Sequence, residues 1–229
     1  MLVACWSVKG GCGTSVVAVM LALALGRWSV SPLPGDAVAP LLVDLTGDLP
    51  AVLGLPPAAA PGVHEWLHAA AGAGNVGTDA LARLVQPVDG LRLLPRGERR
   101  PPSDGGERLV DAVHALGGGD VAVADCGRAS SSSPADELVD SAAVSLLVLR
   151  PCYLALGRAI DAAMRASAVA LIDEPGRALG PAEIEDALGV PVVVSIRARP
   201  SIARAVDSGL LSWKPPRRLV RALAGVAEA

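Results

Sequence analysis

The first 27 residues constrain this chain most, because they combine an apolar strand, a glycine-rich loop and an apolar helix. Residues 2–8 are mostly apolar, residues 9–15 read Lys-Gly-Gly-Cys-Gly-Thr-Ser, and residues 16–27 are again largely apolar. Three glycines let a backbone bend until successive N–H groups face one anion. The helix that follows adds the positive end of its dipole to the same place. The stretch therefore predicts a phosphate-binding loop.

The lysine of this loop stands in an unusual place. The common phosphate-loop pattern, G-x-x-x-x-G-K-[ST], has its lysine directly before the final hydroxyl residue, and this chain has Thr14 there. Val8 replaces the first glycine of that pattern. The nearest lysine is Lys9 at the start of the loop, and the one other lysine of the chain is Lys214. The interpretation of the loop therefore depends on this relocated lysine.

Length and composition are those of one α/β domain with an aliphatic core. The chain has 229 residues, of which 52% are apolar, and it contains no phenylalanine. That length suffices for one large domain and hardly for two. The four cysteines, Cys5, Cys12, Cys126 and Cys152, form no C-x-x-C pair, which favours a reduced cytoplasmic protein over a disulfide framework. No apolar run approaches the roughly 20 residues of a membrane span.

Strands and helices alternate along the rest of the chain. Apolar runs predict strands at residues 39–44, 91–95, 120–125, 142–149, 169–172 and 190–196. A capping signal predicts that one helix begins at Asp48. Further helices are predicted at residues 63–71, 79–85, 107–116, 154–166, 181–188, 201–208 and 216–227. Residues 28–40 and the serine-rich residues 129–134 are expected to be surface loops. This alternation predicts a single-domain, mostly parallel twisted sheet with helices on both faces.

Two of the predicted strands end in an acid, at Asp44 and Asp125. Ligands of such sheets bind at the carboxyl ends of the strands, where both acids would meet the glycine-rich loop. A hydroxyl such as that of Ser15, together with a strand-end aspartate, is what bound Mg²⁺ needs, directly or through water. The competing interpretation is a plain glycine turn, a solvated Lys9, and acids satisfied by helix N-termini.

The segment Lys9-Gly-Gly-Cys-Gly-Thr-Ser15 resembles the deviant Walker A motif of the ParA/MinD superfamily, whose signature lysine begins the loop. A Thr or Ser in place of the second lysine is characteristic of its CpaE/TadZ branch, which is associated with polar placement of Flp-type pilus machinery. Residues 44–54, 91–95, 120–127 and 203–209 are similar to later elements of that branch. The resemblance implies a P-loop NTPase fold of the SIMIBI, ParA/MinD type over residues 1–229. We expect no receiver-like N-terminal domain.

The resemblance also implies a site for ATP and Mg²⁺. Ser15 and Asp125 would hold the metal, and Lys9 would reach across a nucleotide-sandwich homodimer to the partner's phosphates. Lys9 and Asp44 are the implied catalytic residues. The implied nucleotide-binding residues are Lys9, Gly10, Gly11, Cys12, Gly13, Thr14 and Ser15.

One departure from the family concerns catalysis. The superfamily's Asp-x-Asp after the second strand, whose second acid helps to position the attacking water, is here Asp44-Leu45-Thr46. Threonine is no base and polarises water less than a carboxylate does. Phosphoryl transfer depends on charge compensation, so the loss of one cation and one carboxylate slows it. We expect ATP binding with slow hydrolysis at most, which is a weak ATPase or an ATP-binding pseudo-enzyme.

The function implied by the resemblance is a bacterial, nucleotide-dependent dimeric switch, positional or regulatory, for Flp/Tad-type pilus or secretion assembly. Its partners would be a second copy and a pilus or secretion ATPase or another assembly component, in the cytoplasm, at a pole or at the inner face of the membrane. The alternatives are a pseudo-ATPase scaffold that needs no nucleotide, and a DNA-partitioning or septum-site ATPase. The net charge of −3 argues against DNA. The basic residues 214–223 either form a terminal helix packed on the sheet or contact a membrane surface, DNA or a partner.

Overall fold

A computed structural model describes residues 1–28, 39–56, 61–73, 76–128, 133–162 and 165–228. At its centre lies an eight-stranded sheet with the strand order β3-β4-β2-β5-β1-β6-β7-β8. The strand pairs are parallel except for the antiparallel pair of β3 with β4. The strands are β1 (Leu2–Ser7), β2 (Leu41–Asp44), β3 (Gln86–Val88), β4 (Leu91–Leu94), β5 (Ala122–Arg128), β6 (Val144–Leu149), β7 (Ala168–Asp173) and β8 (Val192–Arg197).

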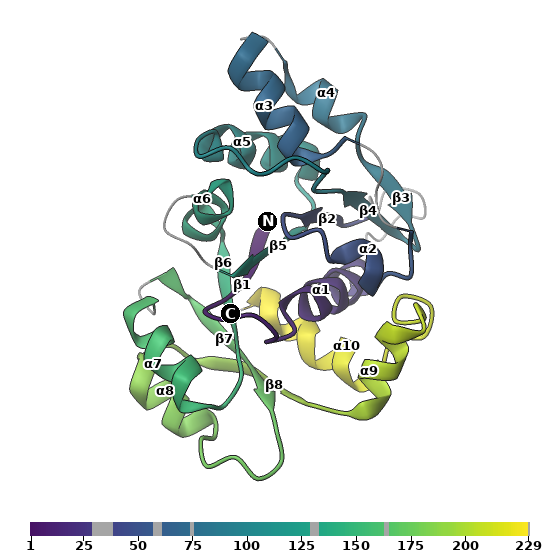
Figure 1. The fold of residues 1–229 in the computed structure, drawn as a ribbon. Coiled ribbons are helices and arrows are strands. Elements are labelled where there is room, and N and C mark those ends of the chain that lie inside the picture. The colour runs from purple at the N-terminus through teal and green to yellow at the C-terminus, as the bar shows by residue number, and fades with distance from the viewer. Residues whose placement is uncertain (29–38, 57–60, 74–75, 129–132, 163–164, 229) are drawn as a thin grey trace.

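Helices cover both faces of this sheet (Figure 1). The helices are α1 (Thr14–Trp28), α2 (Leu49–Val52), α3 (Val63–Ala73), α4 (Thr78–Ala82), α5 (Gly106–Gly117), α6 (Pro134–Ser141), α7 (Tyr153–Ala162), α8 (Pro181–Leu188), α9 (Pro200–Asp207), α10 (Arg217–Ala224) and the 3-10 helix η2 (Gly225–Glu228). One apolar cluster joins the sheet to α1, α2, α9 and α10. A second joins its other face to α3, α4, α5, α6, α7 and α8. The predicted fold class is confirmed.

The central strand β1 shows why the strands are apolar throughout. It lies between β5 and β6, and all six of its residues are buried. Because side chains alternate along a strand, Val3 and Cys5 enter the cluster beneath α1. Leu2, Ala4 and Trp6 enter the cluster on the opposite face. A parallel strand that is covered on both faces thus reads as a continuous apolar run.

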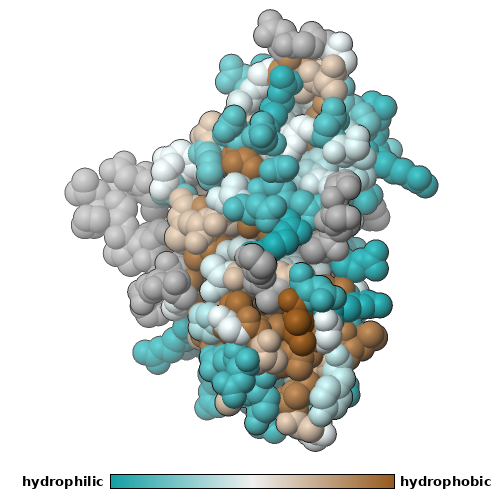
Figure 2. Space-filling model, turned by 90° about the vertical axis from the view of Figure 1, so that its left-hand side faces the viewer, coloured by the Kyte–Doolittle hydropathy of each residue, from teal (hydrophilic) through white to brown (hydrophobic). Residues whose placement is uncertain are grey.

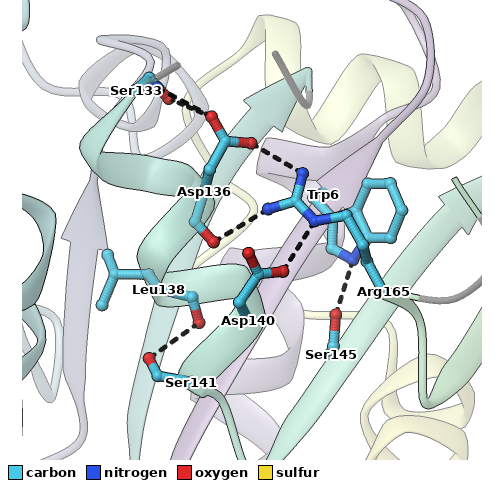
Figure 3. A network of polar contacts seen from close by, with 8 residues as sticks. All are labelled: Trp6, Ser133, Asp136, Leu138, Asp140, Ser141, Ser145 and Arg165. Carbon is cyan, nitrogen blue, oxygen red and sulfur yellow. Dashed lines mark hydrogen bonds and ion pairs between the residues drawn. The ribbon is translucent and has the colours of Figure 1, made fainter. Parts of the chain in front are cut away.

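Helix α6 was not predicted, although its start carries a capping box. Asp136 accepts hydrogen bonds from the Ser133 N–H and hydroxyl, at 2.9 and 3.0 Å, which is the arrangement such a box provides. Arg165 forms ion pairs with two acids of this helix, at 2.8 Å to Asp136 and 2.7 Å to Asp140 (Figure 3). The Arg165 guanidinium also lies 5.9 Å from the centre of the Trp6 ring. The network anchors α6 beside the sheet.

The edge strand β3 was also missed. It pairs with β4 through the two-residue turn Asp89-Gly90, whose φ angles are 46° and 80°. An Asp-Gly pair is a strong signal for such a hairpin turn, and Pro87 suits an edge strand.

The predicted loops at residues 28–40 and 129–134 lie mostly outside the described residues. None of the described helices combines the length and apolar character of a membrane span.

Candidate functional site

The glycine-rich loop connects the end of β1 to the start of α1, as predicted. The Ser7 hydroxyl lies 3.0 Å from the Lys9 carbonyl oxygen and 3.2 Å from that of Gly127, so it ties the loop to the end of β5. Gly11 and Gly13 have φ angles of 75° and 88°. These angles favour glycine because a Cβ atom disfavours this backbone region. The sequence thus folds into a tight turn that leads directly into the helix.

The loop borders open space. A Cβ atom placed on Gly10, Gly11 or Gly13 would meet no other atom within 4 Å. The loop and the first turn of α1 line a cavity of about 520 Å³, which Thr46 and Arg128 also border. The first N–H groups of a helix have no intrahelical acceptor, and the helix dipole makes this end positive. The cavity is therefore suited to a phosphate group.

Two buried carboxylates lie beside this cavity. Asp44 and Asp125 are neighbours in the β2–β5 register and are 1% and 0% exposed. The Thr46 hydroxyl lies between them, 3.1 Å from Asp44 Oδ1 and 3.0 Å from Asp125 Oδ2. The N–H groups of Thr46 and Gly47 donate to Asp44 Oδ1 at 3.0 and 2.7 Å, and the Gly127 N–H donates to Asp125 Oδ1 at 3.1 Å. One hydroxyl proton thus serves two carboxylates.

Burial dominates the electrostatics of this pair. It raises the pKa of Asp125 to about 6, against the hydrogen bond from Ser15, while the negative charge of Asp44 raises it further. Burial also raises the pKa of Asp44, against hydrogen bonds from Gly47 and Thr46. Asp44 Oδ2 is buried and has no hydrogen-bond partner among the described residues. A buried carboxylate with a free acceptor is stabilised by a cation. The free atom belongs to Asp44, and the Ser15 hydroxyl bonds to the neighbouring Asp125, so the oxygen donors gathered here fit a magnesium ion.

Gly127 allows Thr46 to approach the end of β5. A Cβ atom at Gly127 would lie 2.5 Å from Thr46 Cγ2, and the φ angle of Gly127 is 63°. A larger residue at this position would push Thr46 away from the two carboxylates. We define Asp44, Thr46 and Asp125 as the carboxylate cluster. The glycine at position 127 is therefore a packing requirement of this cluster.

The structure brings most of the predicted site residues together. Gly10, Gly11, Cys12, Gly13, Thr14 and Ser15 line the cavity. Asp44 and Asp125 do not line it, but both contact Thr46, which does. The Lys9 side chain does not line the cavity, and its ammonium group lies 3.4 Å from the Gly10 carbonyl oxygen. No group of three or more His, Cys, Asp or Glu side chains that suits a metal occurs among the described residues.

A second cavity, of about 320 Å³, was not predicted from the sequence. It runs from the other side of the glycine-rich loop to β8, α9 and α10, and its walls are mainly apolar. Ile172, Ile196 and Ile202 belong to these walls, while Arg150 and Arg199 add charge at the side. Apolar residues beside a phosphate-sized site suit an aromatic base. Two isoleucines at the ends of neighbouring strands were a usable signal, but only the strand order shows that they meet.

A larger cavity of about 610 Å³ lies elsewhere, between α5 and α6. Its lining includes Asp136, Asp140 and Arg165, which already pair with each other. It shares no lining residue with the cavity at the glycine-rich loop. We therefore place the candidate site at the loop and not in this larger space.

No protein-family model matches the chain, and no curated protein matches it. Solved structures do. The septum site-determining protein MinD of Pyrococcus horikoshii, complexed with Mg-ADP, is 21% identical, with a TM-score of 0.74 over 99% of this chain and 94% of the other. A ParA family ATPase from Chlorobium tepidum is 20% identical, with a TM-score of 0.73 over 99% and 98%. This chain has the fold of MinD and ParA.

A third structure, the MinC:MinD cell division complex of Aquifex aeolicus, matches with a TM-score of 0.74 and 18% identity, over 97% of this chain and 93% of the other. At these identities the likeness concerns the fold.

Proposed function

We propose that this chain is an ATP-binding, dimeric switch of the ParA/MinD type and of the CpaE/TadZ kind, acting in Flp/Tad-type pilus or secretion assembly. One observation carries the proposal. The glycine-rich loop and the positive end of α1 line one cavity, and Thr46, which also lines it, contacts two buried strand-end carboxylates. A plain glycine turn needs neither the open space nor the buried acids. The pilus assignment rests on the resemblance of the loop and of residues 44–54.

The parts of the site have distinct roles in this proposal. The backbone of Gly10, Gly11 and Gly13 holds the phosphates, and the first turn of α1 adds its dipole. Ser15 and Asp125 hold the magnesium ion, which supplies charge compensation to the phosphates when it is bound. The second cavity takes the nucleoside. Its apolar walls suit the base.

The same site supports slow hydrolysis at most. Asp44 Oδ1 already accepts hydrogen bonds from two N–H groups, at 2.7 and 3.0 Å. Thr46 occupies the place of the family's second acid, and a hydroxyl is a poor base for an attacking water. Thr14 replaces the cation that would stabilise the developing charge. The loop keeps what holds a nucleotide, while the groups that would cleave it are reduced.

Dimerisation is supported by exposed apolar side chains near the same edge of the sheet. Tyr153, Leu154 and Ile160 of α7 are 75%, 59% and 53% exposed. Figure 2 views the side of the molecule that carries α6, α7 and α8, and apolar residues gather in its lower half. Such patches mark interaction sites. Cys12, in the loop that Lys9 begins, lies near Arg150, which precedes α7 in the chain. A second copy placed at this edge would meet Lys9. An assembly partner, as MinC is for MinD in the Aquifex complex, would bind the dimer.

Equilibrium titration with a fluorescent ATP analogue tests the proposal. We expect saturable binding that Mg²⁺ strengthens, because Ser15 and Asp125 provide a place for the ion. Phosphate release, measured in the same samples, should be slow. The absence of saturable binding at millimolar analogue would reject the switch.

The carboxylate cluster also favours a second candidate, a pseudo-ATPase scaffold. The Thr46 hydroxyl bonds to both carboxylates, at 3.1 and 3.0 Å, and so partly satisfies them from within the chain. A scaffold would fold and bind its partner equally well with and without nucleotide. The fold is also that of a septum-site protein and a ParA family ATPase. A role of that kind would show as salt-sensitive DNA binding or membrane recruitment.

A further inference from the structure

A groove lies between the end of β8, the start of α9 and α10. It has a volume of about 360 Å³, and four arginines border it: Arg197, Arg199, Arg217 and Arg218. These elements follow one another at the C-terminal end of the chain and lie close together in Figure 1. We call this feature the arginine groove. The groove adjoins the second cavity at the glycine-rich loop and shares with it Ile196, Arg197, Arg199, Ile202 and Leu219. Arg217 and Arg218 line the groove but neither cavity at the loop, so these two residues distinguish it.

The charge of the groove is not neutralised within the chain. All four arginines are exposed, and the ion pairs of the described residues involve Arg150, Arg165 and Arg177 instead. Between residues 195 and 226 the one acid is Asp207. The cations of that stretch are Arg197, Arg199, Arg204, Lys214, Arg217, Arg218 and Arg221. A protein with a net charge of −3 thus concentrates positive charge on one surface.

The floor of the groove is apolar. Ile196, Ile202 and Leu219 line it between the arginines. A second hollow, of about 570 Å³, shares Arg197 and Arg199 with the groove and continues to Arg204. The positive surface is therefore longer than one small molecule. Its ligand should be extended, should carry several anionic groups, and should bring apolar groups between them.

Two other anionic partners fit less well. A membrane-bound amphipathic helix must turn its apolar face to the lipid, but Leu219, Val220 and Leu223 of α10 are buried in the core against α1. Single-stranded nucleic acid binds through aromatic side chains that stack on bases, and none of the described residues that line the groove is aromatic.

We infer that the arginine groove binds an acidic peptide segment of a partner protein, in which carboxylates flank apolar side chains. The guanidinium groups pair with the carboxylates, for which their fork geometry is suited. Ile196, Ile202 and Leu219 receive the apolar side chains. Individually exposed ion pairs are weak, so affinity comes from several pairs acting together with the apolar contact. The floor of the groove also borders the cavity proposed for the nucleoside, so the peptide is tested without nucleotide and through Arg217 and Arg218, which do not line that cavity.

Fluorescence anisotropy with a labelled peptide tests this inference. The probe is a 12-residue peptide of glutamate and leucine, and its copy with glutamine in place of glutamate is the uncharged control. Titration uses the full chain without nucleotide. We expect saturable binding of the acidic probe, at least about tenfold weaker binding of the uncharged copy, and weakening as salt rises, because screening affects exposed charges.

The variant Arg217→Glu/Arg218→Glu should weaken probe binding at least about tenfold. The matched control Arg83→Glu/Arg100→Glu makes the same change of net charge at exposed positions far along the chain, and it should bind as the parent does. Arg217→Gln/Arg218→Gln serves if the reversal disturbs α10, as judged by circular dichroism. Equal binding by parent and groove variants would overturn the inference. So would a groove-dependent preference for duplex DNA or for anionic phosphatidylglycerol vesicles.

Discussion

The glycine-rich loop and the carboxylate cluster lie at the same edge of the sheet, yet they are built in opposite ways. The loop is open, since Cβ atoms at Gly10, Gly11 and Gly13 would meet nothing within 4 Å. The cluster is closed, since Asp44 and Asp125 are buried and share the Thr46 hydroxyl. A loop of this kind accepts an anion without rearrangement. To bind a cation, the cluster must give up a hydrogen bond between Thr46 and a carboxylate.

This difference separates holding a nucleotide from acting on it. Binding to a preformed loop costs little conformational entropy. The carboxylate cluster stores electrostatic strain, because burial raises the pKa of both acids, and a bound cation would relieve that strain. We therefore expect changes in the loop to affect affinity, and changes in the cluster to affect stability and its pH dependence.

The largest expected effect comes from filling the loop. Gly13→Val places a branched side chain in the open space and disturbs the N–H groups that face the phosphates. Hydrogen bonds to charged groups contribute about 1.5–3 kcal/mol each, so the loss of two corresponds to at least about 100-fold in affinity. Titration with the fluorescent ATP analogue measures it.

Gly176→Val is the matched control for the loop variant. Its φ angle is +80°, close to the +88° of Gly13, and a Cβ atom there also meets nothing within 4 Å. Both variants should therefore lose a similar amount of stability, about 1–3 kcal/mol, from backbone strain. Equal nucleotide affinity in the two variants would show that the loop does not hold the phosphates.

The cluster should respond to pH instead. Burial raises the pKa of Asp125 from 3.8 to about 6, so the folded state holds this proton more tightly than the unfolded state does. Stability from this group is complete below pH 4 and falls as the pH rises through about 6. Asp125→Asn removes the charge and keeps an acceptor for the Gly127 N–H. We expect its stability relative to the parent to rise by about 1–2 kcal/mol between pH 5 and pH 8.

Urea unfolding of the nucleotide-free chain at both pH values measures this change. Asp111→Asn, on the exposed face of α5, removes the same charge outside the cluster, and its difference from the parent should stay constant. A pH-independent difference for Asp125→Asn would mean that the carboxylate is ionised and compensated in the folded chain at pH 5.

The alternation of strands and helices along the chain and the glycine-rich loop could be predicted from the sequence because both are local patterns. An apolar run that ends in an acid, as at residues 39–44, predicts a buried strand. Glycine at positions 11 and 13 was a local signal for the positive φ angles that the structure has there. Helix α6 was missed although Ser133 and Asp136 spell its capping box, because the neighbouring serines suggested a loop. The β3–β4 hairpin was missed although Asp89-Gly90 marks it.

Long-range contacts were beyond the sequence. Nothing local to Thr46 indicates that its hydroxyl contacts Asp125, 79 residues further along the chain, as well as Asp44. This contact depends on β2 lying beside β5. The arginine groove likewise depends on β8, α9 and α10 meeting. The basic residues 214–223 were visible, and α10 packs its apolar face on α1 as one of the two interpretations had it. That four arginines border a groove was not visible.

The last prediction concerns Lys9, which belongs to the loop by sequence but not by contact. Its ammonium group lies 3.4 Å from its neighbour's carbonyl oxygen and does not line the cavity. A lysine that acts within its own chain would weaken nucleotide binding when it is removed. A lysine that reaches a second copy would leave that binding intact.

We expect Lys9→Ala to weaken ATP-dependent dimerisation about tenfold, which corresponds to the loss of one charged hydrogen bond. The affinity of the monomer for nucleotide should change less than about twofold. Sedimentation velocity with the ATP analogue measures the first and titration with ADP the second. Lys214→Ala, the same substitution at the other lysine of the chain, should change neither. Equal losses in both measurements would place Lys9 in the site of its own chain, and the open loop would then include its lysine.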